Sequence, residues 1–137
     1  MKISTLALAA LLTGFALHTP AQAGTLTEKA IEKAEKNYLA CLNSGNEGVV
    51  TTAIAEVVRL RLALPNRPME SIGHRLAELT VNGETAAIRY RAYLAGAALE
   101  NPRLIPAAVA ASASGNDDLF ALIAARLQAT LLGYAQH

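Results

Sequence analysis

The phrase SGNEGVV at residues 44–50 recurs in altered form as VNGETAA at residues 81–87 and as SGNDDLF at residues 114–120. Each copy has a small polar residue and a glycine, followed by an acidic residue and then by apolar residues. Glycine and asparagine favour turns, and an acidic residue favours the first turn of a helix. The three copies therefore predict three turns that each lead directly into a helix, with glycine supplying turn conformations that residues with a side chain resist. These glycines are Gly45, Gly83 and Gly115.

The spacing of the phrase predicts a structural repeat. With Val50, Ala87 and Phe120 taken as equivalent, the intervals are 37 and 33 residues, which lie in the range of helical-hairpin repeats. Ala and Leu dominate the composition and favour helix throughout. The sequence therefore predicts an all-α fold of about six helices, arranged as three stacked antiparallel hairpins in a short right-handed α-solenoid-like array.

The six predicted helices are separated by Gly, Asn and Pro residues. Their predicted starts are Thr25, Glu47, Pro68, Glu84, Asn101 and the residue after Asn116. The fifth helix is Ala-rich and is expected to continue through Ala113, with Pro106 disturbing its first turn.

Apolar residues at helical spacing predict which face of each helix is buried. The fourth helix has the broadest apolar arc, which includes Tyr90, so we expect it to be central. The residues predicted to face inward on the first, third and sixth helices are Ile31, Ala34, Tyr38, Cys41 and Leu42; Met69, Ile72, Leu76 and Leu79; and Phe120, Ile123, Leu127, Leu131 and Tyr134.

The N-terminus has the features of a cleaved signal peptide. Lys2 precedes an uncharged apolar run at residues 3–17, and Ala21 and Ala23 form an Ala-x-Ala cleavage signature. A membrane anchor is the alternative, but this run is shorter than the roughly 20 residues that span a bilayer. We expect residues 1–23 to be removed and the protein to be exported to the periplasm or secreted.

Residues 24–137 then form a single helical-repeat domain without a transmembrane anchor. Its 11 basic residues, after removal of Lys2, balance 11 acidic residues, so nothing attracts it electrostatically to nucleic acid or to an anionic membrane. Cys41 is the only cysteine and excludes an internal disulfide. We expect it to act as a small buried hydrophobe, with an intermolecular disulfide or a redox role as alternatives.

The segment ETAAIRYRAYLAGAALENP at residues 84–102 resembles the second helix of a HEAT-type repeat, in which an acidic residue precedes an apolar–Arg pair and then small residues. The pair here is Ile88 and Arg89. The other two hairpins match only by spacing and lack the apolar–Arg pair at the matching position. The resemblance to HEAT/armadillo-like proteins implies a binding scaffold.

Residues typical of catalysis are few in this sequence. Glu70, His74 and Glu78 share one side of the third helix, but this side is opposite its apolar face, so we interpret it as a solvated surface and predict no metal site. The sequence has no Gly-rich phosphate loop and no nucleophile paired with a histidine. It therefore predicts a protein that is not an enzyme and needs no cofactor.

Two groups of polar residues are candidates for binding. Arg61 and Arg91 interrupt apolar faces, and they either serve the structure at hairpin boundaries or line a cleft for an anionic group. A polar ridge on the even-numbered helices is either an interaction surface or an ordinary solvent face. The ridge consists of Glu56, Arg59, Arg89, Tyr93 and Arg126.

These observations predict an exported, non-catalytic interaction module or adaptor that binds another exported protein. The alternative is a carrier that holds a small apolar or lipid-like ligand in an Ala-lined cavity of several hundred cubic ångströms, with Arg61 and Arg91 near its mouth.

Overall fold

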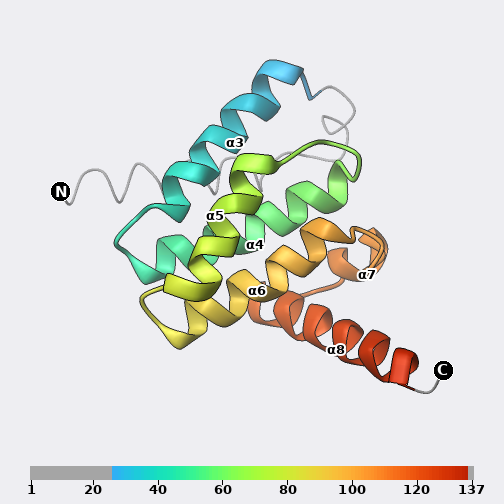
Figure 1. Cartoon of the computed structure of the whole chain (residues 1–137). Helices are drawn as coiled ribbons and strands as arrows, with labels where there is room; N and C mark the ends of the chain where they lie inside the picture. Colours follow the sequence, from blue (N-terminus) through green and yellow to red (C-terminus); the bar gives the residue numbers. More distant parts are fainter. Residues whose placement is uncertain (1–25, 136–137) are drawn as a thin grey trace.

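The computed structural model describes residues 26–135, and all regular secondary structure in that range is helical. The prediction of an all-α fold with about six helices is confirmed for these residues. The predicted signal peptide, residues 1–23, lies outside the described range. The helices are α3 (Glu28–Leu42), α4 (Glu47–Ala63), α5 (Glu70–Asn82), α6 (Ala86–Glu100), α7 (Ala107–Ala111) and α8 (Asn116–Ala135) (Figure 1).

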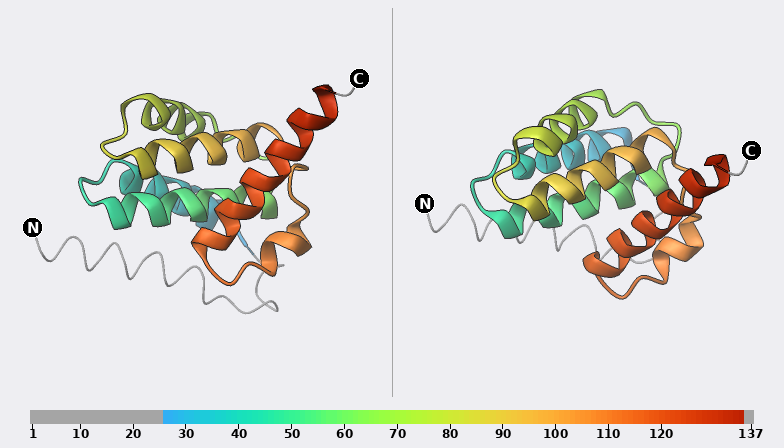
Figure 2. Two further views of the ribbon diagram at one scale, coloured as in Figure 1. Left: turned by 90° about the horizontal axis from the view of Figure 1, so that it is seen from below. Right: turned by 60° about the horizontal axis from the view of Figure 1, so that its bottom comes forward.

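Helices α4 and α6 lie at the centre of the fold. They pack against each other, while α3 packs on α4 and α5 packs on α6 (Figures 1 and 2). Helices α3 and α5 also touch, so four helices form two layers. Helix α8 crosses α6 and α4, and α7 packs on α4. The predicted central position of the fourth helix is thereby confirmed.

One hydrophobic core joins these helices. Within residues 26–135, no polar or charged side chain belongs to the buried set. The faces predicted for the first and third helices are confirmed, because all of their residues are buried: Ile31, Ala34, Tyr38, Cys41, Leu42, Met69, Ile72, Leu76 and Leu79.

Side-chain caps set the first residue of three helices. The hydroxyl of Thr27 accepts a hydrogen bond from the Ala30 amide at 3.2 Å, so α3 begins later than the predicted Thr25. Asn46 caps α4 and Thr85 caps α6 in the same way. Each cap satisfies an amide that has no partner inside its helix.

The predicted fifth helix is much shorter than expected. Only Ala107–Ala111 is helical, and residues 101–106 form turns. Pro106 stands directly before the helix. Because it has no amide hydrogen, it does not continue a helix that starts at Asn101. The high Ala content had suggested a longer helix.

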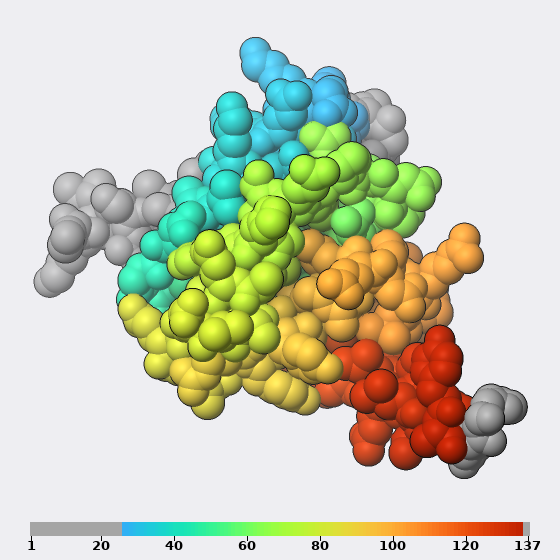
Figure 3. Space-filling view, in the orientation of Figure 1, coloured from blue at the N-terminus to red at the C-terminus, as the bar shows by residue number. Residues whose placement is uncertain are grey.

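Some residues that were predicted to face inward are exposed. Tyr90 is exposed because it lies on a side of α6 that its neighbours leave uncovered. On α8, Leu131 is 60% exposed and Tyr134 is 77% exposed. Helix α8 has 20 residues, about 30 Å in length, and α6 has 15, about 22 Å, so the second half of α8 extends away from the body (Figures 1 and 3).

Residue 83 is glycine because neighbouring atoms leave no room for a side chain, and not because its backbone conformation is unusual. Its φ of −56° and ψ of 141° are accessible to residues with side chains, and no glycine in residues 26–135 has a positive φ. A Cβ atom at Gly83 would lie 2.6 Å from the Leu79 carbonyl oxygen and 2.8 Å from Cγ2 of Ile88. Gly45 and Gly115 have open space at the same position. The prediction that these glycines supply turn conformations that other residues resist is therefore wrong. Of the three, only Gly83 lacks room for a side chain.

Replacing Gly83 with alanine should destabilise the fold by about 1–3 kcal/mol, because the added methyl overlaps a backbone oxygen that cannot move freely. Gly45→Ala is the matched control, and it should leave stability unchanged or slightly higher. Urea unfolding monitored by circular dichroism measures both variants. Equal stability of the two would contradict the steric role of Gly83.

Candidate functional site

An open groove of about 870 Å³ lies where α5, α6 and α8 meet. Its two helical walls present small residues, and the start of α5 and part of α8 border it. Figure 3 presents the face on which these three helices lie. Because small residues leave the helix backbones uncovered, another chain can approach them closely. The small residues are Gly73, Ala77, Gly96 and Ala97.

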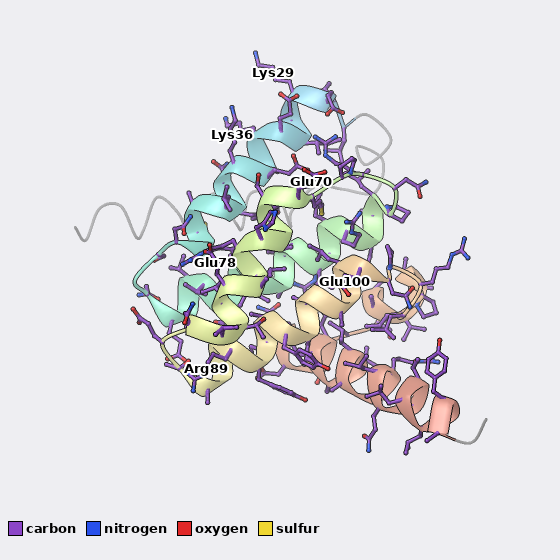
Figure 4. All side chains as sticks on the ribbon, viewed as in Figure 1. Lys29, Lys36, Glu70, Glu78, Arg89 and Glu100 are labelled. Carbon is purple, nitrogen blue, oxygen red and sulfur yellow. The ribbon has the colours of Figure 1, made fainter. Side chains whose placement is uncertain are left out.

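The rim of this groove combines acidic and apolar groups. Glu70 and His74 on α5 and Glu100 on α6 line it, and Figure 4 shows the two carboxylates on the same face. Tyr93, which is 48% exposed, and the half-buried Leu127 add apolar surface. The rim therefore offers carboxylates beside an aromatic ring.

Arg61 lies at the end of the groove, but its guanidinium is used by the chain itself. Its Nη1 donates to the carbonyl oxygens of Arg67 at 2.6 Å and Pro65 at 3.2 Å. These bonds tie the end of α4 to the loop that leads into α5. The structural interpretation of Arg61 is supported by these contacts, although Arg61 lines the same groove as Glu70 and Glu100.

Arg67 forms an ion cluster that sequence reasoning missed. Its Nε donates to Glu35 at 2.6 Å and its Nη1 donates to Glu28 at 2.6 Å. The hydrogen bonds that Arg67 donates to Glu35 and, with a smaller effect, to Glu28 raise the pKa of Arg67 above its ordinary value. The cluster holds the loop before α5 against α3. The sequence gives only a weak signal for it, an arginine between Pro65 and Pro68.

Arg91 lies at a different place from Arg61. Its Nη2 donates to Asp117 at 2.8 Å, and its guanidinium carbon is 5.7 Å from the centre of the Phe120 ring. It borders a separate hollow of about 240 Å³ together with Thr51 and the first turn of α8. The two arginines therefore do not line one shared mouth.

The five residues of the predicted polar ridge have different roles. Arg59 pairs with Glu56 at 2.9 Å and also donates to Asn116 at 2.9 Å, so this pair joins α4 to the start of α8. Arg89 donates to the carbonyl oxygen of Gly83 at 2.7 Å. Among the five, Tyr93 borders the groove, and Arg126 is exposed on α8.

The Glu70, His74 and Glu78 side of α5 faces solvent, as predicted. Glu70 and His74 border the groove, whereas Glu78 pairs with Arg75 at 2.9 Å. No group of three or more metal-ligating side chains with suitable placement occurs in the described part of the chain.

Cys41 is buried on the core side of α3, where the sequence placed it. Burial raises the pKa of its thiol, which disfavours the reactive thiolate. Its position is that of a small hydrophobic residue within the core.

Comparisons with family models, curated proteins and solved structures find no significant match to this chain. Across residues 26–135, no helix combines the length and the hydrophobicity that crossing a membrane requires. A proposal for the function of this all-helical protein therefore rests on the geometry of the groove.

Arg61 and Arg91 should respond differently to replacement by leucine. Arg61→Leu leaves two carbonyl oxygens of the loop without their donor and should cost about 1–3 kcal/mol. Arg91→Leu removes an ion pair to an exposed carboxylate and should cost about 0–1 kcal/mol. Urea denaturation of both variants measures the difference, and a larger loss at Arg91 would contradict these assignments.

Glu56 should make stability depend on pH. Burial raises the pKa of Glu56 above its ordinary value, and the charge and hydrogen bond of Arg59 oppose this effect. The folded protein therefore binds the proton more tightly than the unfolded chain, and this carboxyl lowers stability as pH rises through its titration. Relative to Glu56→Gln, the wild-type protein should lose stability as pH rises above about 4.3, the ordinary pKa of a glutamate. If the unfolding free energies of the wild type and of Glu56→Gln change with pH in the same way, this effect is excluded.

Proposed function

We propose that the chain is an exported, non-catalytic helical-repeat protein that binds a segment of another exported protein in the groove between α5 and α6. The observation that carries this proposal is the open groove itself, with small residues on both walls and carboxylates on its rim. One continuous hydrophobic core lies beneath it.

The groove suits a polypeptide segment with an apolar side chain next to a lysine or arginine. Gly96 and Ala97 let a segment approach the α6 backbone, and Tyr93 offers an aromatic surface. Glu70 and Glu100 are free to pair with a basic side chain, since neither forms an ion pair among the described residues. Charge on the rim then selects the partner, and apolar contact supplies most of the affinity.

The helical-repeat assignment is supported by the first four helices. The α3–α4 pair lies beside the α5–α6 pair, with α4 against α6 and α3 against α5. Ile88 and Arg89, the pair that resembles a HEAT-type repeat, both contact the turn at Gly83. The short α7, whose main contact is with α4, is the departure from a regular array of three stacked hairpins.

Export is supported by the sequence of residues 1–23, which has a basic start, an apolar run and an Ala-x-Ala cleavage signature. The mass of the protein purified from the periplasm identifies its first residue, which we expect to be Gly24.

The second candidate function is a carrier of a small apolar or lipid-like ligand. The volume of the groove, about 870 Å³, lies in the range of ligand pockets. Its openness to solvent and the position of Arg91 in another hollow favour the polypeptide. A retained small apolar molecule in native mass spectrometry would favour the carrier.

The groove is tested by photo-crosslinking in cells that express the protein. A photoreactive residue at Ala77, which is exposed in the groove, should capture one polypeptide of defined mass, and the same residue at Ala125 on α8 should not. Gly96→Arg should abolish capture, because it fills the groove and repels a basic segment. Gly133→Arg is the matched control, since it also has open space on a helix. Capture that survives Gly96→Arg would contradict the proposal.

A further inference from the structure

The core-facing side of α8 continues beyond the core. Phe120 and Ile123 are buried against the body, and the same helical face continues through Leu127, Leu131 and Tyr134 at spacings of three or four residues. Every residue from 128 to 135 is exposed, however. Figures 1 and 2 show this half of the helix projecting past α6. We call Leu127, Leu131 and Tyr134 the α8 stripe.

The projecting half of α8 is as poor in charged residues as a helix that is buried against a partner. Arg126 is the single charged residue between 119 and 135. A helix in water gains most of its stability by packing an apolar face, and this half has no neighbour along the stripe within residues 26–135. The stripe therefore has the properties of an interface.

We propose that the α8 stripe is covered by the same stripe of a second copy of this chain, with the two helices antiparallel. In the register that we propose, Leu127 of one copy faces Tyr134 of the other. The two-fold axis then passes between residues 130 and 131, and Leu131 of each copy packs near the axis. Such a contact is isologous and closes with two copies.

The charges of α8 agree with this pairing. In this register, Arg126 of one copy lies beside residue 135 of the other, so the two Arg126 side chains are about 13 Å apart along the helix axis. Arg126 then lies at the C-terminal end of the second helix, where unpaired carbonyl groups carry partial negative charge. The last turn of α8 contains no basic residue of its own. A parallel pairing would instead place the two arginines side by side.

The second copy also reaches the groove. Leu127 borders the groove, so Tyr134 of the second copy lies at the α8 edge of the groove. Aromatic side chains bury up to about 150–250 Å² each and leucines bury less, and the stripe is already partly covered, so the two copies together bury under about 1,000 Å². This area is below the lower limit for a stable interface, so the dimer should dissociate on dilution.

The test compares two leucines with nearly equal exposure. Leu131, which is 60% exposed, lies on the stripe, and Leu132, which is 58% exposed, points about 100° away from it. Sedimentation velocity over a range of concentrations should show a monomer–dimer equilibrium for the wild type and for Leu132→Lys. Leu131→Lys should be monomeric at the same concentrations and keep the far-UV circular dichroism of the wild type.

Cysteine variants test the register. Oxidation of a mixture of Leu127→Cys and Tyr134→Cys chains should give a mixed disulfide, and Tyr134→Cys alone should give little dimer. Cys41 does not compete, because it is buried in the core. Efficient linking of Tyr134→Cys to itself would overturn the antiparallel arrangement.

Three further results would overturn the second copy as the occupant. They are a wild-type protein that is monomeric at every concentration, equal effects of Leu131→Lys and Leu132→Lys, and a different polypeptide that needs Leu131 for binding. The inference does not rest on the proposed function. Gly96→Arg tests the groove and Leu131→Lys tests the dimer, so either can fail alone.

Discussion

The packing of α4 against α6 holds the remaining helices in place. Each of these two helices also packs against an outer partner, α3 or α5, and both contact α8. Ala53, Ala92 and Ala95 are fully buried on them, and small side chains allow the helix backbones to approach closely. Because no polar or charged side chain belongs to the buried set of residues 26–135, the fold depends on shape and apolar burial.

Three arginines form hydrogen bonds and ion pairs that hold the loops between the helices. Arg61 and Arg89 donate to backbone carbonyl groups of loops, and Arg67 joins its loop to two glutamates of α3. These guanidinium groups are occupied where they stand, which fixes the loops between the helices. The carboxylates on the groove rim, Glu70 and Glu100, have no such partner among the described residues. The groove thus presents two carboxylates without ion-pair partners among residues 26–135, together with the guanidinium of Arg61.

Helical periodicity predicted the faces of α3 and α5 because each is apolar on one side and charged on the other. It did not predict where α8 stops being covered, since periodicity within one helix carries no information about the length of its neighbour. The groove was missed for a similar reason. Its walls are formed by Gly73 and Ala77 on α5 and by Gly96 and Ala97 on α6, and neither pair is unusual until the helices are brought together.

One local feature explains both the open groove and the exposed stripe. In a regular third hairpin, a full-length helix would precede α8 and extend the layer formed by α3 and α5. Pro102 and Pro106 leave only Ala107–Ala111 helical, and this short helix packs on α4. Among residues 26–135, helix α8 therefore has no outer partner along its second half. The open groove lies next to Leu127, where the exposed half of α8 begins, so the shortness of α7 accounts for both features.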